Sequence, residues 1–219
     1  MVKLMSMQHV VDHPESVSLQ IYPTKILRSK SAEVLPSEKQ YIGATFDVME
    51  RIMEDHNGIG IAAPQIGLSK QLVLIDFEYA DPNSGEKHGL KVRMVNPQIT
   101  DSSREKEDSQ EGCLSFPGVH AIVQRSMVVS VKYLNENLEP CFITNATGLA
   151  AFCLQHECGH LDGRMFFNAL SAKDKASVLK TYRQIKDGDI IPEPGEIIVV
   201  ETASIQKKHD PMAGNAAIT

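Results

Sequence analysis

The stretch ATGLAAFCLQHECGHLDG, residues 146–163, carries the strongest fold signal in the chain. Its apolar residues and its histidines recur at intervals of three and four, which is the period of one face of an α-helix. That face carries Leu149, Phe152, Cys153, His156 and His160. The sequence therefore predicts a helix whose one side holds both histidines.

Within this helix, His156-Glu157-Cys158-Gly159-His160 matches the H-E-x-x-H pattern of metal-dependent hydrolases. Histidines four positions apart on a helix can bind one ion together. Glu157 can then act as a general base without being a ligand. The alternative is a helix with two surface histidines and a chance glutamate, in which Leu149 and Cys153 are ordinary core residues.

The third ligand separates the classes of hydrolase that use this pattern. The longer pattern H-E-x-x-H-x-x-G-x-x-H has its glycine at Gly163, but Phe166 occupies the position of the third histidine. Phenylalanine cannot bind a metal, so that class is excluded. A distant glutamate would be Glu193, Glu196 or Glu201, which stand near prolines without a helical face to hold them.

Cys113, in SQEGCLSFPG, is a further candidate ligand. A thiolate with two imidazoles leaves the fourth tetrahedral position open for water. The alternative is that Cys113 is a small buried hydrophobic residue, which is the more common role of a free cysteine. The residues by themselves favour that alternative.

The segment NGIGIAAPQIG, residues 57–67, resembles a dinucleotide-binding loop only superficially. That loop requires a preceding strand and a following helix, whereas here a helix precedes it and Pro64 follows. Gly58 and Gly60 instead permit a ligand to approach the backbone closely. Gln65 offers an amide donor for a developing oxyanion. A tight connection is the alternative interpretation.

The bulk properties are those of an ordinary globular domain. The chain has 219 residues and a mass of 24.2 kDa, with 42% hydrophobic and 23% charged residues. Its net charge of −6 argues against a nucleic-acid backbone or an anionic membrane as the main partner. It has no apolar run of about 18 residues and no recognisable signal peptide. We therefore expect reduced cysteines and a cytoplasmic location.

The remaining segments predict an α+β fold. Helices are expected over residues 36–58 and 171–186, and the polar stretch 101–110 is expected to be a solvated loop. Extended segments are expected at 71–79, 90–100, 128–144 and 196–201. We expect antiparallel β-strands packed around a central helix that bears the H-E-x-x-H pattern, with an N-terminal helix and a C-terminal helix.

Three motifs in one order, GIGIAAPQ, EGCLS and QHECGHLDG, closely resemble the peptide deformylases. The opening IYPTKILRSKSAEV and the helix before the glycine-rich turn are also similar, so the resemblance covers residues 21–186. It implies one catalytic domain over that range. Residues 1–20 are then an N-terminal extension, and residues 187–219 are a C-terminal extension that is partly disordered or packs back over the domain.

The resemblance implies a metal-dependent hydrolase that removes the N-formyl group from the formyl-methionine of nascent polypeptides and releases formate. It implies Cys113, His156 and His160 as ligands of one divalent metal ion. In this family the ion is generally Fe²⁺, with Zn²⁺, Ni²⁺ or Co²⁺ as substitutes. Glu157 would be the acid/base group, and the Gln65 amide and the Leu114 backbone N–H would bind the oxyanion.

The same resemblance implies the substrate contacts. Backbone groups of Ile59 and Gly60 would bind the peptide, together with Gly112. The methionine side chain would lie against Leu149, Phe152 and Cys153, and His120 is a further candidate contact. The implied partners are formylated nascent chains, with transient association with the ribosome, no direct nucleic-acid binding, no membrane and a monomeric chain.

The chain departs from the family at Gly159, where relatives commonly have aspartate. In relatives that aspartate pairs with an arginine, which here would be Arg125, so this pair cannot form. Glycine within a helix also costs about 1 kcal/mol relative to alanine. We expect stability or metal retention to suffer before catalysis does. Two alternatives stay open, a related hydrolase for another acyl substrate and a catalytically silent metal-binding protein.

Overall fold

The computed structural model describes residues 5–80, 85–193 and 196–202. The strands form two sheets, one with five strands in the order β1-β2-β3-β6-β7 and one with three strands in the order β4-β5-β8. The strands are β1 (Gly60–Ala62), β2 (Leu72–Ala80), β3 (Lys87–Ser102), β4 (Lys106–Glu111), β5 (Val119–Ser126), β6 (Val128–Leu134), β7 (Pro140–Thr147) and β8 (Ile198–Val200).

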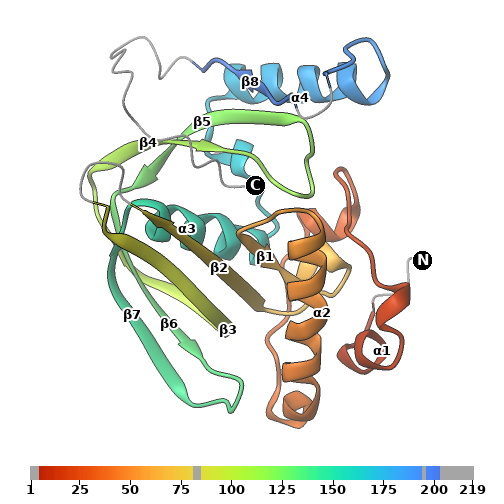
Figure 1. Cartoon of the computed structure of the whole chain (residues 1–219), viewed down its shortest axis with the longest axis vertical. Coiled ribbons are helices and arrows are strands. Elements are labelled where there is room, and N and C mark those ends of the chain that lie inside the picture. The colour runs from red at the N-terminus through yellow and green to blue at the C-terminus, as the bar shows by residue number, and fades with distance from the viewer. Residues whose placement is uncertain (1–4, 81–84, 194–195, 203–219) are drawn as a thin grey trace.

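The helices join these sheets into one body (Figure 1). The α-helices are α1 (Met7–Asp12), α2 (Ile42–Asp55), α3 (Gly148–Leu161) and α4 (Ala172–Lys186), and the 3₁₀ helices are η1 (Pro14–Ser16), η2 (Lys25–Arg28), η3 (Pro36–Tyr41), η4 (Ala63–Ile66) and η5 (Phe166–Ala169). Among the named strands, every pairing is antiparallel except that of β5 with β8. The predicted α+β class with antiparallel sheets is therefore confirmed.

Strands β1, β2, β3, β5, β6 and β7 all contact α3, and Figure 1 shows this helix enclosed by them. Alternate residues of these strands, such as Val73, Ile75 and Val131, are almost fully buried. They pack with Cys153 and Leu154 of α3 in one apolar cluster. Alternation along a strand and 3–4 spacing along a helix thus supply complementary apolar faces.

One expectation about a loop is wrong. The polar stretch 101–110 completes β3 and then forms β4, which pairs with β5 in a register that matches Glu111 with Ala121. Ser109 and Glu111 are buried, while Lys106 and Glu107 are exposed. The segment has no apolar residues, so the side chains that it buries are polar. Glu111, for example, is paired with Arg125 and His156.

The N-terminal segment packs against α2. Met7 of α1 is 1% exposed and Val10 is fully buried, and both belong to a cluster with Phe46 and Met49 of α2. Figure 1 shows α1 beside α2. Residues 5–20 thus contribute apolar side chains to the main core.

Replacing Met7 with Ala should reduce the free energy of unfolding by about 2–5 kcal/mol, because a buried side chain of this size leaves a cavity. Urea denaturation monitored by circular dichroism would measure the change. The exposed neighbour Gln8, replaced by Ala, is the matched control and should change stability little. Equal stability of the two variants would show that α1 contributes nothing to the core.

Helix α4 begins where the sequence predicts, because the Ser171 hydroxyl accepts a hydrogen bond from the Asp174 N–H at the N-cap. Its residues Val178 and Tyr182 pack on Phe116 and Phe167. The Tyr182 and Phe116 rings are stacked with centroids 3.8 Å apart. Across the described segments, none of the helices has the length and apolar character needed to cross a lipid bilayer.

Candidate active site

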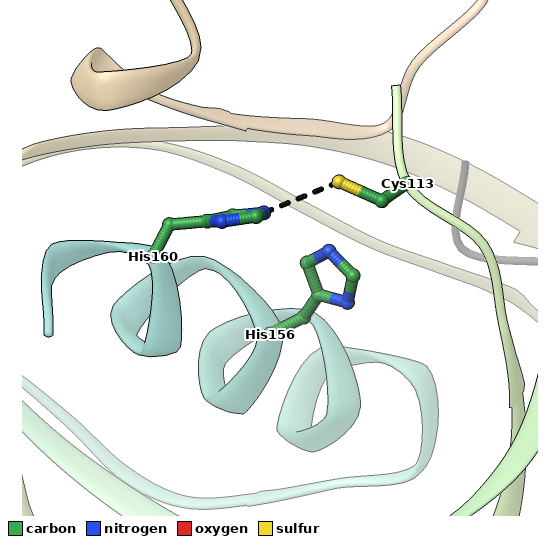
Figure 2. Close-up of side chains that lie close together, drawn as sticks. All are labelled: Cys113, His156 and His160. Carbon is green, nitrogen blue, oxygen red and sulfur yellow. Dashed lines mark hydrogen bonds between the residues drawn. The ribbon is translucent and has the colours of Figure 1, made fainter. Parts of the chain in front are cut away.

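Helix α3 presents His156 and His160 one turn apart, and the loop after β4 brings Cys113 toward them (Figure 2). The candidate ligand atoms of these three residues all lie within 4.8 Å of one another. Cys113 Sγ is 3.3 Å from His160 Nε2. The three side chains are 5%, 4% and 1% exposed, respectively, so they form one enclosed cluster.

This cluster fits one divalent transition-metal ion. A thiolate and two imidazoles are the ligand types that such ions prefer, and three protein ligands leave one position for water or substrate. Phe166 is buried and stacks beside His156, with ring centroids 6.3 Å apart. Glu193, Glu196 and Glu201 are exposed and stand outside the cluster.

Glu111 connects the cluster to Arg125. Its carboxylate accepts two hydrogen bonds from Arg125, at 2.7 and 2.8 Å, and its Oε2 lies 2.9 Å from His156 Nδ1. Burial would raise the pKa of Glu111, but the hydrogen bonds and charge of Arg125, together with His156, hold that pKa at about 2. A carboxylate on Nδ1 orients the ring so that Nε2 is free to bind a metal.

Sequence reasoning missed the role of Glu111, although the residue stood in the quoted EGCLS motif. The available signal was its position two residues before the candidate thiolate. The sequence also predicted that Arg125 has no carboxylate partner, because Gly159 replaces the aspartate that pairs with this arginine in relatives. The structure corrects this, since Arg125 has a bidentate partner in Glu111.

Glu157 directly follows His156 on α3, is 2% exposed and stands close to the glycine-rich turn. Its burial raises its pKa to about 7. A Cβ atom on Gly60 would lie 2.7 Å from Glu157 Oε1, so a side chain at position 60 would displace the carboxylate. Glycine is therefore required here for close approach. A carboxyl group with a pKa near neutrality can both accept and release a proton.

Gln65, in η4, is held with its amide nitrogen toward the cluster. Its Oε1 accepts a hydrogen bond from the Ala62 N–H at 2.7 Å, and its Nε2 lies 3.5 Å from Cys113 Sγ. Leu114 follows Cys113, and its Cδ1 would be 2.8 Å from a Cβ on Gly58. The structure thus places both Gln65 and Leu114 where the segment that carries Cys113 meets the glycine-rich turn.

The candidate substrate residues fall into two groups. One apolar cluster contains Ile59, Leu149, Phe152 and Cys153, and of these four residues only Cys153 is fully buried. Gly112 lies apart from them against the buried His120, whose Nε2 would be 2.1 Å from a Cβ at position 112. Burial lowers the pKa of His120. The apolar group is continuous with α3, the helix that carries the histidines.

Gly159 stands on α3 directly before His160. A Cβ there would meet nothing closer than the Arg164 backbone oxygen at 3.8 Å. The residue lines a polar cavity of about 620 Å³ together with Arg125, Gln155 and Cys158. None of Cys113, His156 and His160 lines this cavity, so it is distinct from the ligand cluster described above.

A buried Cys-His-His cluster beside the glutamate of an H-E-x-x-H helix defines the class of mononuclear metal-dependent hydrolases. A family profile described as polypeptide deformylase matches residues 17–176. The chain belongs to the peptide deformylase family.

Relatives and solved structures agree with this membership. The chain is 34% identical over 170 residues to a peptide deformylase of Prosthecochloris aestuarii, covering 78% of this chain and 88% of the relative. It resembles a class I type b peptide deformylase from Acinetobacter baumannii with a TM-score of 0.65 and 32% identity, over 70% of this chain and 98% of that one. It also resembles a peptide deformylase from Ehrlichia chaffeensis with a TM-score of 0.67 and 30% identity, over 81% and 99%.

Proposed function

We propose that this chain removes the N-formyl group from the N-terminal formyl-methionine of nascent polypeptides and releases formate. The observation that carries the proposal is the enclosed cluster of Cys113, His156 and His160 with Glu157 on the same helix, in a chain of the deformylase family. The enclosing strands and the central H-E-x-x-H helix would hold these side chains in register for hydrolysis.

The ligands of the metal would be Cys113 Sγ, His156 Nε2 and His160 Nε2. The contact between Glu111 and His156 Nδ1 supports the use of the opposite ring nitrogen. We propose Fe²⁺ as the physiological ion, with Zn²⁺, Ni²⁺ or Co²⁺ able to replace it. When bound, such an ion would act as a Lewis acid toward water and the formyl carbonyl.

Glu157 would move the proton. Its carboxylate would accept a proton from the attacking water and donate it to the departing amine of methionine, which balances the hydrolysis without another acid. Its Oε2 has no hydrogen-bond partner among the described residues, which leaves it available for water or the amine. The pKa near 7 that results from burial supports both steps at neutral pH.

Gln65 Nε2 and the Leu114 N–H would bind the oxyanion that forms on the formyl oxygen. The hydrogen bond from the Ala62 N–H holds the Gln65 amide in one orientation, so its N–H groups are directed before substrate arrives. Donors that need no reorganisation stabilise a transition state more than mobile donors do.

Replacing Gln65 with Glu should lower kcat by about 10²–10³-fold. The new carboxylate can still accept from the Ala62 N–H, but it removes the amide donor and repels the oxyanion. Formate release from a formyl-Met peptide, followed with an added formate dehydrogenase, would measure the loss. Replacement of the exposed Gln8 by Glu is the matched control. A kcat equal to that of the unaltered chain would contradict the oxyanion role.

The methionine side chain would lie in the apolar cluster of Ile59, Leu149, Phe152 and Cys153, which begins next to the histidines. Backbone groups of Ile59, Gly60 and Gly112 would hold the peptide itself. An apolar wall beside a few directed polar groups is the usual construction of a small-ligand site.

We also propose that residues 21–186 form the catalytic domain, with extensions before and after it. The proposed substrate is formed during translation, so we expect a cytoplasmic monomer that associates transiently with ribosomes and binds neither nucleic acid directly nor membranes. The net charge of −6 supports weak affinity for nucleic acid.

Anaerobic purification, metal quantification and an assay with formyl-Met and acetyl-Met peptides would test the proposed activity. We expect about one metal ion per chain and rapid formate release, with little hydrolysis of the acetyl peptide, because a site with three protein ligands holds a single ion. Stoichiometric metal without formate release would overturn the proposal and favour a metal-binding protein without this activity.

A further inference from the structure

The polar cavity of about 620 Å³ beside α3 lies where this helix meets the end of β5. Its lining includes Gln155 and Gly159, which are one turn apart on α3, and Arg125 of β5. The Ser126 N–H donates to Gln155 Oε1 at 3.0 Å, and Gln155 Nε2 donates to the Ser126 oxygen at 2.9 Å. These two hydrogen bonds hold the end of β5 against α3, so they also fix Arg125 beside the cavity.

The charge in the interior of this cavity is positive. Among the described lining residues, four charged ones are exposed to solvent, and their two positive and two negative charges balance: Lys30, Arg164, Glu33 and Asp162. Water and salt screen charges in such positions. The remaining charged lining residue is Arg125, whose side chain is only 14% exposed. Because this charge is screened least, the interior of the cavity favours an anion.

The guanidinium of Arg125 has one edge without a partner in the described part of the chain. Its Nε and Nη2 donate to the Glu111 carboxylate, which covers the Nε–Nη2 edge. A guanidinium has further N–H donors, and its Nη1–Nη2 edge can also pair with a carboxylate through two parallel hydrogen bonds. Glu111 is fully buried and does not line the cavity. The uncovered edge is therefore the one available to a ligand there.

The cavity also has room and apolar surface for a small organic group. A Cβ atom on Gly159 would have the Arg164 backbone oxygen, at 3.8 Å, as its nearest neighbour, so the space in front of this glycine is open. Ile99 and Leu161 contribute apolar side chains to the lining. Apolar surface beside one directed cation suits a ligand that has a short aliphatic part and a carboxylate.

We propose that this cavity binds a small monocarboxylate of about the size of acetate through the Nη1–Nη2 edge of Arg125. The two carboxylate oxygens would accept the two parallel hydrogen bonds, and the aliphatic part would contact Ile99 and Leu161. A planar guanidinium matches the geometry of a carboxylate, so the site should prefer acetate to chloride. The proposal is independent of the proposed hydrolase activity, because none of the three candidate metal ligands lines the cavity.

Nuclear magnetic resonance of the zinc-loaded chain, which is diamagnetic, would test the site. Sodium acetate would be titrated at constant ionic strength, with sodium chloride as the reference salt. We expect the methyl signals of Ile99 and Leu161 to shift with a dissociation constant on the order of 1–10 mM, as two charge-assisted hydrogen bonds provide. Nuclear Overhauser effects should connect the acetate methyl group to the same residues. The absence of saturable shifts at Ile99 and Leu161, or shifts confined to residues around the metal, would overturn the proposal.

Replacing Gly159 with Asp should weaken acetate binding at least about tenfold, because a carboxylate tethered beside the Arg125 edge competes at a high effective concentration. The matched control is the replacement of Gly159 by Ala, which raises helix propensity without adding a charge and should leave the dissociation constant within about twofold. Acetate binding by the Asp variant as tight as that by the unaltered chain would overturn the assignment to Arg125. The titration of the unaltered chain decides the question even if the Asp variant fails to fold.

Discussion

Replacing Glu157 with Gln is expected to stop formate release while the metal remains bound. Glutamine has nearly the same shape as glutamate but cannot accept a proton from water or return one to the amine. General acid–base groups contribute about 10²–10⁴-fold, and here one group performs both transfers. None of the three candidate ligands is altered, so metal content should stay near that of the unaltered chain.

Metal analysis and single-turnover formate release on the same sample would test this expectation. The control is the exposed Glu54 of α2, replaced by Gln, which makes the same chemical change far from the cluster. Full activity in the Glu157 variant would show that another group moves the proton. Loss of metal together with activity would show that Glu157 acts mainly by supporting the cluster.

Replacing Glu111 with Gln should have the largest effect on stability. The side chain is fully buried between Arg125 and His156, so the variant leaves a buried guanidinium without its counter-charge. Breaking a buried pair in this way typically costs about 3–5 kcal/mol. The histidine also loses the carboxylate that orients it, which typically weakens metal binding about 10–100-fold.

The effect of Glu111 on stability should depend on pH in a defined direction. The pKa of this carboxyl is about 2 in the folded protein and has a reference value of 4.5. Its ionised form is thus favoured by folding, so its stabilisation is complete above the reference value and is lost as the pH falls toward 2. The difference in the free energy of unfolding between the unaltered chain and the Glu111→Gln variant should therefore shrink as the pH falls over the same range.

Urea denaturation of the metal-free proteins at several pH values, followed by metal titration at neutral pH, would measure both effects. Glu107 is exposed on the same strand, and its replacement by Gln is the matched control. Identical unfolding of the unaltered and Glu111 variant chains would contradict a stabilising role for this ion pair.

Gly159 has a narrower consequence than the family pattern suggested. The position is open, and Arg125 does not lack a carboxylate partner, because Glu111 supplies it from β4. The expected cost in stability or metal retention is therefore limited to the low helix propensity of glycine and to the contacts that a side chain at position 159 would make in the adjoining cavity. It stays a prediction.

The elements with a regular local period could be predicted from the sequence. The 3–4 spacing in residues 146–163 predicted α3, and apolar runs predicted β2, β3, β6 and β7, because side-chain periodicity depends only on backbone geometry. The motif spacing identified His156, Glu157 and His160 for the same reason, since a helix alone determines their mutual position. The resemblance to a family, which compares several motifs at once, singled out Cys113 and Gln65.

Only the tertiary structure could reveal the contacts between segments far apart in the chain. Cys113 reaches His160 from 47 residues away, and Glu111 reaches His156 from 45. Strand β4 has no apolar pattern, so the sequence does not show which of its residues are buried. Its pairing with β5 and the ion pair between Glu111 and Arg125 decide this. The packing of α1 against α2 likewise depends on which surfaces meet. Local spacing determined the helices and strands, whereas long-range packing determined their partners.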